Sequence, residues 1–245
     1  MTRTVFITGI LGVIGQATAS TFRDSGWRVV GMDRRPETSG FSEADEFLRA
    51  DVAGESIAAI LEPFLRNLPR LDAVVNNAAA QIEKPLIDTA DVQWNLIMAT
   101  NVRSAFIVSR IAYPYLVKTT GAIVNVASVH ALATSAGLGA YATSKGALVA
   151  LTRASALEFA PAGVRVNAIL PGAVESPMLR ASLARSPKPD EALARLISRT
   201  PLRRIASADE ISRGILFLAD GEQSSFITGQ TLVADGGAMA QLSTE

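Results

Sequence analysis

A serine, a tyrosine and a lysine close together in the sequence could carry acid–base chemistry. Ser128 follows the strand-like segment Ala122–Ala127, and Tyr141 and Lys145 are four positions apart in an expected helix. That spacing places the phenol and the ammonium on one helical face. Because a nearby cation stabilises the phenolate, it moves the pKa of a tyrosine down from about 10 towards a useful acid–base range. The alternative is a Tyr–Lys pair on an exposed helix, with a serine that only bonds the end of the strand.

A glycine-rich loop follows the first strand-like segment, Thr4–Thr8, and leads directly into a helix. Glycines let such a loop turn sharply and bring its N–H groups close to a pyrophosphate, which the positive end of the helix dipole also favours. A strand before the loop and a helix after it are the context that a dinucleotide-binding loop requires. The contacts of this loop with a dinucleotide are expected from Gly9, Gly12, Val13, Ile14 and Gly15.

A carboxylate ends the second strand-like segment, Arg28–Met32. Asp33 lies 18 positions after Gly15, which fits a side chain that accepts hydrogen bonds from the adenosine ribose hydroxyls. A carboxylate at that point repels a 2′-phosphate, so we expect NAD to be preferred over NADP, with Arg34 partly offsetting the repulsion. The alternative is an ordinary turn residue before Pro36.

The segments that carry these residues alternate between strand and helix along the whole chain. Several strand candidates are continuously apolar, which is typical of parallel strands covered on both faces. The strands are expected at Thr4–Thr8, Arg28–Met32, Glu46–Ala50, Ala73–Asn76, Ala122–Ala127, Arg165–Leu170 and Thr231–Ala234. The helices are expected at Gly15–Ser25, Ser56–Asn67, Asp91–Lys118, Ala140–Phe159 and Ser207–Ala219. This alternation predicts an α/β fold in one domain over residues 1–245, with a doubly wound, Rossmann-type parallel sheet of about seven strands.

One proline-containing stretch, residues 172–201, interrupts the alternation and is named the flap here. It holds two short amphipathic pieces, Met178–Arg185 and Glu191–Ser198. Because long excursions from a compact domain are often functional, we expect the flap to cover the substrate. The alternative is a helical hairpin that only packs on the surface. Four arginines of the flap could meet an anionic substrate or be ordinary surface residues: Arg180, Arg185, Arg195 and Arg199.

The composition excludes several kinds of site. The chain has no cysteine and one histidine, His130, which excludes disulfides, thiol nucleophiles and multi-histidine metal sites, so no metal is expected. Lys and Arg balance Asp and Glu at 23 each, which argues against a broad nucleic-acid or anionic-membrane surface. Without a signal-peptide pattern or a long apolar run, the chain is expected to be cytoplasmic, with a small-molecule substrate and no nucleic-acid or membrane partner.

Taken together, the motifs resemble those of the short-chain dehydrogenase/reductase family of about 250 residues. In order, they are Thr8-Gly9, Gly12, Gly15, Asn76-Asn77-Ala78-Ala79, Asn101, Ser128, Tyr141, Lys145 and Pro171-Gly172, and the likeness extends through the closing segment 227–237. The resemblance implies an NAD(H)-dependent oxidoreductase that transfers a hydride between nicotinamide and a secondary alcohol or ketone. It also implies a homo-oligomer, usually a tetramer, with Asp91–Lys118 and Ala140–Phe159 as candidate interface helices.

The resemblance implies roles for individual residues as well. Tyr141 would be the general acid–base, Lys145 would lower its pKa and hold the nicotinamide ribose, and Ser128 would hydrogen-bond the reacting oxygen. Asn101 would anchor a water in the proton relay. Further cofactor contacts would come from Asp51 and Val52 at the adenine, Asn76, Asn77, Ala78 and Ala79 along the cleft, and Pro171, Gly172 and Val174 at the nicotinamide.

The substrate pocket of this family draws on the loop after Ser128. His130 and Gln81 are therefore the expected substrate contacts, with a loop histidine satisfied by backbone as the alternative for His130. We expect a polar, hydroxylated substrate such as a sugar or a hydroxy acid.

Two features depart from the family pattern. Val13 occupies the usual middle glycine position, and the resulting G-x-x-G-x-x-G spacing is more typical of a longer, epimerase-like branch, for whose C-terminal domain 245 residues are too few. Ala79 stands where the family commonly has glycine. Two other functions stay open: an epimerase or dehydratase that uses NAD transiently, and a cofactor-binding regulator without catalysis, which the intact Tyr141 and Lys145 disfavour.

Overall fold

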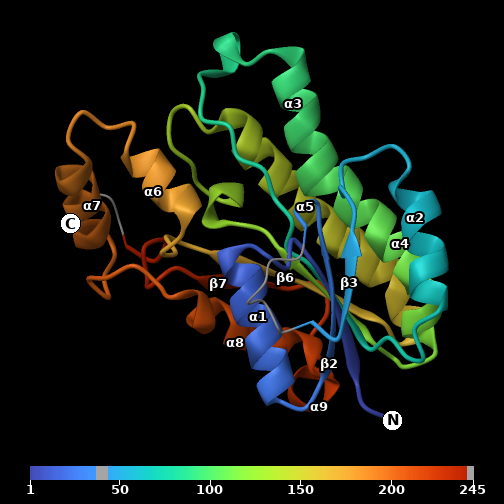
Figure 1. Ribbon diagram of the computed structural model, residues 1–245. Helices are drawn as coiled ribbons and strands as arrows, with labels where there is room; N and C mark the ends of the chain where they lie inside the picture. The colour runs from blue at the N-terminus through green and yellow to red at the C-terminus, as the bar shows by residue number, and fades with distance from the viewer. Residues whose placement is uncertain (37–43, 242–245) are drawn as a thin grey trace.

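A seven-stranded sheet forms the centre of the computed structural model, which describes residues 1–36 and 44–241 (Figure 1). The strands are β1 (Thr4–Thr8), β2 (Arg28–Asp33), β3 (Glu46–Arg49), β4 (Ala73–Asn76), β5 (Ala122–Val126), β6 (Arg165–Pro171) and β7 (Thr231–Ala234). They pair in parallel in the order β3-β2-β1-β4-β5-β6-β7. The predicted doubly wound, Rossmann-type sheet is confirmed. Four of the predicted strands end one residue away from the observed position.

Helices cover both faces of this sheet (Figure 1). The α-helices are α1 (Val13–Asp24), α2 (Ile57–Arg66), α3 (Asp91–Met98), α4 (Ser104–Val117), α5 (Gly139–Phe159), α6 (Pro177–Leu183), α7 (Pro189–Arg199), α8 (Ala208–Ala219) and α9 (Gly221–Ser224). Short 3₁₀ turns are η1 (Leu86–Asp88), η3 (Val129–Ala131) and η4 (Ala160–Ala162). Among the described helices, none combines the length and apolar character needed to cross a membrane.

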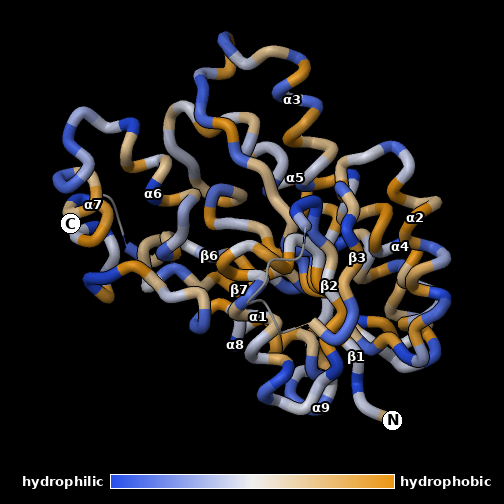
Figure 2. The backbone as a smooth tube through the Cα atoms, viewed as in Figure 1, coloured by the Kyte–Doolittle hydropathy of each residue, from blue (hydrophilic) through white to orange (hydrophobic). Residues whose placement is uncertain are grey.

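On the central strands, neighbouring side chains enter separate cores on the two faces of the sheet. On β1, Phe6 packs in the core shared with α2, α4 and the end of α5, whereas Val5 and Ile7 pack in the core shared with α1 and α8. This follows from the two-residue period of a strand. Figure 2 shows the result, with apolar orange on the strands and more blue on the outer turns of the helices. The strands therefore read as continuously apolar because both of their faces are buried.

The predicted helix over Asp91–Lys118 is corrected by the structure. A π-helical turn, η2 (Ala99–Arg103), separates α3 from α4. Such turns interrupt helices chiefly where a side chain has a specific task. Here the π-helical turn contains Asn101, whose side chain is buried and faces the loop after β4.

The flap contains two helices, as predicted, but their bounds differ from the amphipathic pieces. Each helix begins at a proline, Pro177 or Pro189, because proline at the first helical position has the required backbone angle and no N–H to satisfy. A parallel bridge between Val174 and Ala206 joins the two ends of the excursion. The flap is thus a closed loop that leaves the sheet after β6 and returns before α8.

Candidate active site

The glycine loop lies between β1 and β4, where the strand order reverses and open α/β sheets bind their ligands. Gly9 has φ +65°, and a Cβ there would lie 2.8 Å from Ala78 Cα. A Cβ on Gly15 would lie 2.3 Å from the Gly9 carbonyl oxygen. Asn77 Nδ2 donates to the carbonyl oxygens of Thr8 and Gly9, at 3.1 and 3.0 Å. The loop has room for backbone only, and the segment after β4 fixes its position.

The beginning of α1 fits a pyrophosphate. Gly12 is the N-cap residue, and no side chain caps this end of the helix. Val13 is 37% exposed, so the first turn of α1 opens outward. Uncapped N–H groups at the positive end of a helix favour an anion. The loop of Gly9, Gly12, Val13, Ile14 and Gly15 therefore fits the phosphates of a dinucleotide.

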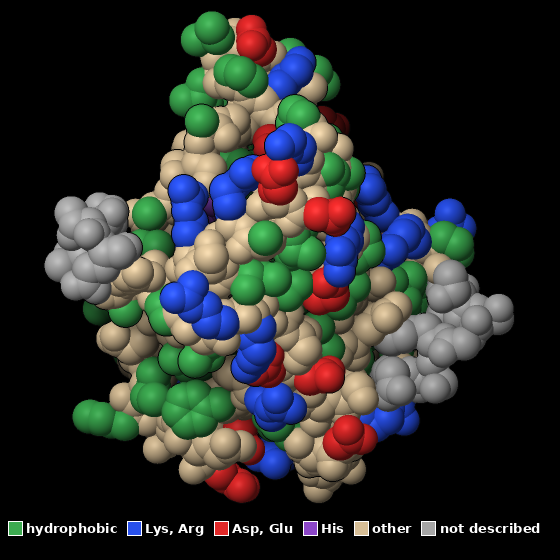
Figure 3. Space-filling view, turned by 90° about the vertical axis from the view of Figure 1, so that its left-hand side faces the viewer, with side chains coloured by type: hydrophobic (Ala, Val, Ile, Leu, Met, Phe, Trp, Pro, Cys, Tyr) green, Lys and Arg blue, Asp and Glu red, His purple; other side chains and the backbone are tan. Residues whose placement is uncertain are grey.

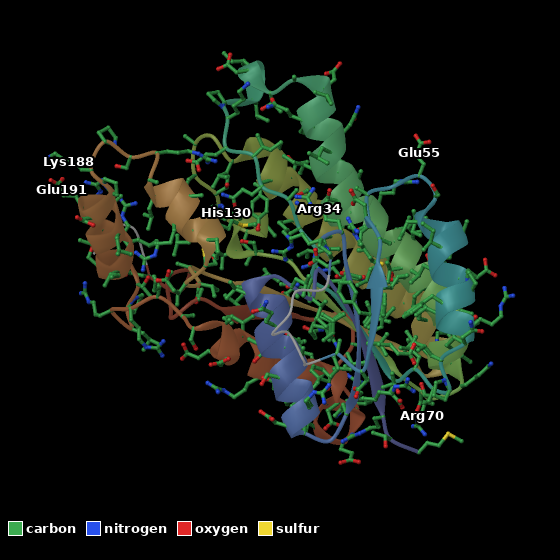
Figure 4. All side chains as sticks on the ribbon, in the orientation of Figure 1. Arg34, Glu55, Arg70, His130, Lys188 and Glu191 are labelled. Carbon is green, nitrogen blue, oxygen red and sulfur yellow. The ribbon has the colours of Figure 1, made fainter. Side chains whose placement is uncertain are left out.

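Asp33 is buried at the end of β2, but its cationic partner is Arg35. The Asp33 carboxylate accepts a hydrogen bond from the Leu11 amide at 3.2 Å and pairs with the Arg35 guanidinium at 3.1 Å. Burial by itself raises the pKa of Asp33, but the bonds and charge of Arg35, with the Leu11 amide, lower that pKa below its usual value. Arg34 is exposed (Figure 4), and its expected effect on a 2′-phosphate stays a prediction, whereas Arg35, which was not predicted at the site, folds back on Asp33.

The other residues expected at the cofactor lie along the same edge of the sheet. Asp51 and Val52 follow β3, and Asp51 accepts a hydrogen bond from the Ala53 amide at 2.9 Å. Ala79 is exposed after β4, so its methyl group projects into open space. Pro171 ends β6, followed by Gly172 and the buried Val174.

Ser128, Tyr141 and Lys145 meet at the carboxyl end of β5. All three are buried, with 8%, 7% and 2% of each residue exposed. Lys145 Nζ lies 5.6 Å from the centroid of the Tyr141 ring and donates to the Val126 carbonyl oxygen at 2.8 Å. The Ser128 hydroxyl also accepts the amide of His130 at 3.2 Å. The burial of Tyr141 and Lys145 does not fit the alternative of an exposed helix pair. The bond of Ser128 with the His130 amide is the local hydrogen bonding that the alternative for the serine describes.

The pKa of Tyr141 does not shift in the predicted direction with the protein's own groups. Burial raises it to about 12, and hydrogen bonding with the Ser128 side chain only partly offsets the rise. The Lys145 ammonium hydrogen-bonds the Val126 carbonyl rather than the phenol. The four-residue spacing correctly predicted that Tyr141 and Lys145 lie close together. It could not predict how deeply the two side chains are buried.

Burial also lowers the pKa of Lys145 to about 8, and this has a measurable effect on stability. Between pH 8 and 10.5 the unfolded lysine keeps its proton while the folded one releases it, so the free energy of unfolding rises with pH. Lys145→Met has no such proton to release. Between pH 7.5 and 10.5 we therefore expect the unfolding free energy of wild type to rise by about 3 kcal/mol relative to that of Lys145→Met, measured by urea unfolding at a series of pH values. A difference between the two proteins that stays constant over this range would contradict the lowered pKa.

Asn101 clamps the loop after β4. Its Oδ1 accepts the Ala80 amide at 2.7 Å, and its Nδ2 donates to the Ala80 carbonyl and to Ser144 Oγ, both at 2.9 Å. Ser144 is on α5 beside Lys145, so one buried amide connects the π-helical turn, this loop and the helix that carries Tyr141.

Comparisons with known proteins agree with this geometry. The family model described as enoyl-(acyl carrier protein) reductase matches residues 9–239. The chain belongs to the short-chain dehydrogenase/reductase family. It is an oxidoreductase of that family, and its fold binds a nicotinamide cofactor.

Relatives of this short-chain dehydrogenase act on different alcohols. A 2-(R)-hydroxypropyl-CoM dehydrogenase of Xanthobacter autotrophicus is 37% identical over 96% of this chain and 98% of the relative. A cyclopentanol dehydrogenase of Comamonas sp. is 39% identical over 79% of this chain and 76% of the relative.

Solved structures of the family have the same fold. A ligand-free aldohexose dehydrogenase from Thermoplasma acidophilum superposes with a TM-score of 0.89 at 27% identity, covering 99% of this chain and 96% of the other. ElxO with NADP bound superposes with a TM-score of 0.87 at 28% identity, covering 98% and 100%.

In this short-chain dehydrogenase, the ring of His130, an expected substrate contact, lies against the ring of Tyr141. Its ring packs edge-on to Tyr141 with 5.8 Å between centroids, and its Nδ1 is 3.0 Å from Thr134 Oγ1. Burial lowers the pKa of His130, while the charge of Glu83 raises it. Figure 4 shows His130 on the loop after β5, on the side of the molecule where the flap lies. Gln81 is half-buried on the neighbouring loop and, within the described residues, bonds none of these side chains.

Most of the flap arginines already have acidic partners. Arg180 pairs with Glu175, Arg185 with Glu83, and Arg195 with Glu191, whereas Arg199 is exposed. Figure 3, which faces the flap side, shows Lys and Arg side chains interspersed with Asp and Glu. These pairs favour the alternative that the flap arginines are ordinary surface residues.

One residue of this side, Glu83, was absent from the predicted site. It bonds two residues of the flap, Ser182 and Arg185. A sequence signal existed, because Glu83 is the acidic residue of the loop between Asn77 and Leu86. Its partners Ser182 and Arg185 lie about a hundred positions later in the chain, and no sequence pattern connects them with Glu83.

Proposed function

We propose that this oxidoreductase transfers a hydride between NAD(H) and a secondary alcohol or ketone, with Tyr141 as the general acid–base. The observation that carries the proposal is the buried cluster of Ser128, Tyr141 and Lys145 beside a loop shaped for a dinucleotide. Relatives named for a hydroxypropyl compound and for cyclopentanol support a secondary alcohol as the reacting group.

The residues that would hold the cofactor follow the edge of the sheet. The pyrophosphate would rest on the loop Gly9, Gly12, Val13, Ile14 and Gly15, with Asp33 and Arg34 at the adenosine ribose. The adenine would lie against Asp51 and Val52, the middle of the cofactor against Asn77, Ala78 and Ala79, and the nicotinamide end against Pro171, Gly172, Val174 and Lys145. When bound, the cofactor supplies the hydride acceptor or donor.

The protein's own residues handle the proton. In oxidation, the ionised form of Tyr141 takes the proton of the substrate hydroxyl and becomes a neutral phenol, and in reduction the neutral phenol gives its proton to the carbonyl oxygen and becomes ionised. Without substrate, the Ser128 hydroxyl hydrogen-bonds the phenol, which lowers the pKa of Tyr141. With substrate bound, its single hydrogen is donated to the reacting oxygen instead. Lys145, held by the Val126 carbonyl, keeps a positive charge near the ring at neutral pH. Asn101 holds the loop at Ala80 through two hydrogen bonds. In the proposed proton relay, a water anchored at Asn101 connects Lys145 to solvent.

We expect NAD to be preferred, with kcat/KM at least about tenfold above that for NADP. Asp33 is buried and ionised at neutral pH, and a carboxylate at this position repels a 2′-phosphate, although its pair with Arg35 opposes that effect. The test is steady-state kinetics with both cofactors on one alcohol. A preference for NADP, the cofactor bound in the ElxO structure, would overturn this assignment.

The substrate we propose is a polar, hydroxylated alcohol, contacted by His130 and Gln81 and covered by the flap. The paired flap arginines disfavour an anionic group, and the aldohexose dehydrogenase with the same fold supports a sugar-like molecule. The experiment is a screen of sugars, polyols, hydroxy acids and cyclic alcohols with NAD, followed by absorbance of NADH. Activity confined to hydrophobic steroids or acyl thioesters would contradict the proposal.

A second function is favoured only by the spacing of Gly9, Gly12 and Gly15. An epimerase or dehydratase that uses NAD transiently would convert its substrate without net formation of NADH, so the same screen separates the two. A regulator without catalysis would bind the cofactor and show neither activity.

We also propose a cytoplasmic homotetramer in which each chain is one domain. Apolar side chains on the candidate interface helices support an assembly, since Phe106 on α4 is 47% exposed and Leu157 on α5 is 79% exposed. Light scattering is expected to give four times the 25.8 kDa mass of the chain, and a clean monomer would refute the assembly.

A further inference from the structure

Glu83 joins the flap to the loop that follows β4. Its Oε2 accepts hydrogen bonds from Ser182 Oγ at 2.9 Å and from Arg185 Nη1 at 2.5 Å. Ser182 is on α6, and Arg185 follows the end of that helix. The other ion pairs of the flap stay within it, so among the described residues this is the one ion pair between the flap and the rest of the protein.

The loop that carries Glu83 is itself held on both sides. Asn101 clamps the amide and the carbonyl of Ala80, and the Lys84 amide donates to the Gly137 carbonyl at 2.7 Å. Asn101 also bonds Ser144 on the helix of Tyr141. The backbone around Glu83 is therefore held in place relative to the helix of Tyr141. The flap residues that Glu83 bonds are held near that helix in turn.

The same carboxylate acts on a residue that contacts Tyr141. Burial lowers the pKa of His130, and the charge of Glu83 raises it. The His130 ring packs on the Tyr141 ring. Glu83 thus has an electrostatic effect on His130, while its hydrogen bonds are directed to the flap.

We propose that Glu83 is a positioning residue that latches the flap over the substrate and thereby sets KM. This inference rests on the proposed function. Glu83 is 28% exposed and Arg185 is 52% exposed, so their pair and the Ser182 bond together shift an equilibrium by about three- to thirtyfold. A latch of that strength favours closure and still opens in each turnover. Glu83 bonds flap residues and none of Ser128, Tyr141 and Lys145. We therefore expect its loss to raise KM, through faster release of the substrate, and to leave kcat unchanged.

Hydrogen exchange measured by mass spectrometry tests the latch without any substrate. In Glu83→Ala, peptides covering α6 and α7 are expected to exchange about three- to thirtyfold faster, while peptides of β1 to β6 are unchanged. In kinetics, KM for the alcohol rises by the same factor, and kcat and the Kd of NAD stay within about twofold. A loss confined to kcat would overturn the proposal.

Glu191→Ala is the matched control. Glu191 is also a carboxylate paired with cations, Lys188 at 2.7 Å and Arg195 at 3.7 Å, but the network is confined to the flap (Figure 4). Its removal is expected to leave the exchange of α6 and the KM unchanged. An equal effect of Glu191→Ala and Glu83→Ala would mean that loss of any flap carboxylate loosens the flap, and would refute the latch.

Arg185→Ala supplies a second variant at a more exposed position, which keeps the proposal testable if Glu83→Ala folds poorly. Both substitutions remove the pair of Glu83 with Arg185, and Glu83→Ala removes the Ser182 bond as well, so the double variant is expected to match Glu83→Ala rather than multiply the two effects. Multiplied effects, or unchanged exchange of α6 in both single variants, would overturn the latch. If exchange accelerates as expected but no alcohol is oxidised, the proposed function fails and the latch stands.

Discussion

Tyr141→Phe is expected to lower kcat/KM by about 10²- to 10⁴-fold, the contribution typical of a general acid–base. The substitution removes the oxygen that would exchange a proton with the substrate and retains the ring that packs against His130. Because the phenol is buried, no solvent group can easily replace it. Steady-state kinetics with NAD and the best alcohol from the screen measures the loss, and fluorescence titration with NADH is expected to give a Kd within about twofold of wild type.

Tyr113→Phe is the control for that experiment. Tyr113 is on α4, where its ring packs against Phe159 at 4.4 Å between centroids, and it has no contact with Ser128 or Lys145. Its activity is expected to remain that of wild type. If Tyr141→Phe kept more than a tenth of kcat/KM, another group would have to carry the proton and the proposed mechanism would be wrong.

Gly15→Ala is expected to weaken NAD binding by about a hundredfold. A Cβ at this position would lie 2.3 Å from the carbonyl oxygen of Gly9 and 2.7 Å from that of Ile10, and both are backbone atoms. The loop must therefore move, and a displacement near 1 Å in a positioning element costs about 10²-fold. Isothermal titration with NAD measures the affinity. The overpacking is also expected to cost about 1–3 kcal/mol of unfolding free energy.

Gly221→Ala separates the loss of binding from a general effect of adding a methyl group to a helical glycine. No atom lies within 4 Å of a Cβ built at Gly221, in the first turn of α9. NAD affinity and stability are expected to be close to those of wild type. A Gly15→Ala protein that binds NAD as tightly as wild type would show that the glycine loop is not the pyrophosphate site.

Patterns local to a segment predicted much of this protein. The apolar runs predicted the strands because burial on both faces leaves no room for polar alternation. The glycine loop was predicted because only backbone fits where Gly9 meets Ala78. Strand ends such as Asp33 and Pro171 were off by a residue, since the last ladder bond depends on the neighbouring strand.

Other features depend on groups distant in the chain. The sequence could not tell whether Arg34 or Arg35 pairs with Asp33, because the turn after β2 decides which guanidinium folds back. The π-helical turn at Asn101 is linked to bonds with Ala80 and Ser144, which belong to other elements. Glu83 meets Ser182 and Arg185 only because the flap returns over the loop after β4.

The sequence by itself determined the parallel α/β sheet, the family and the proximity of Tyr141 and Lys145, because each depends on spacing along one segment or on the order of motifs. The tertiary structure alone decided the direction of the pKa shifts. Burial in the packed site raises the pKa of Tyr141 to about 12 and lowers that of Lys145 to about 8, the reverse of what a cation beside an exposed tyrosine would do. Desolvation depends on every element around a side chain, and no spacing between two residues encodes it.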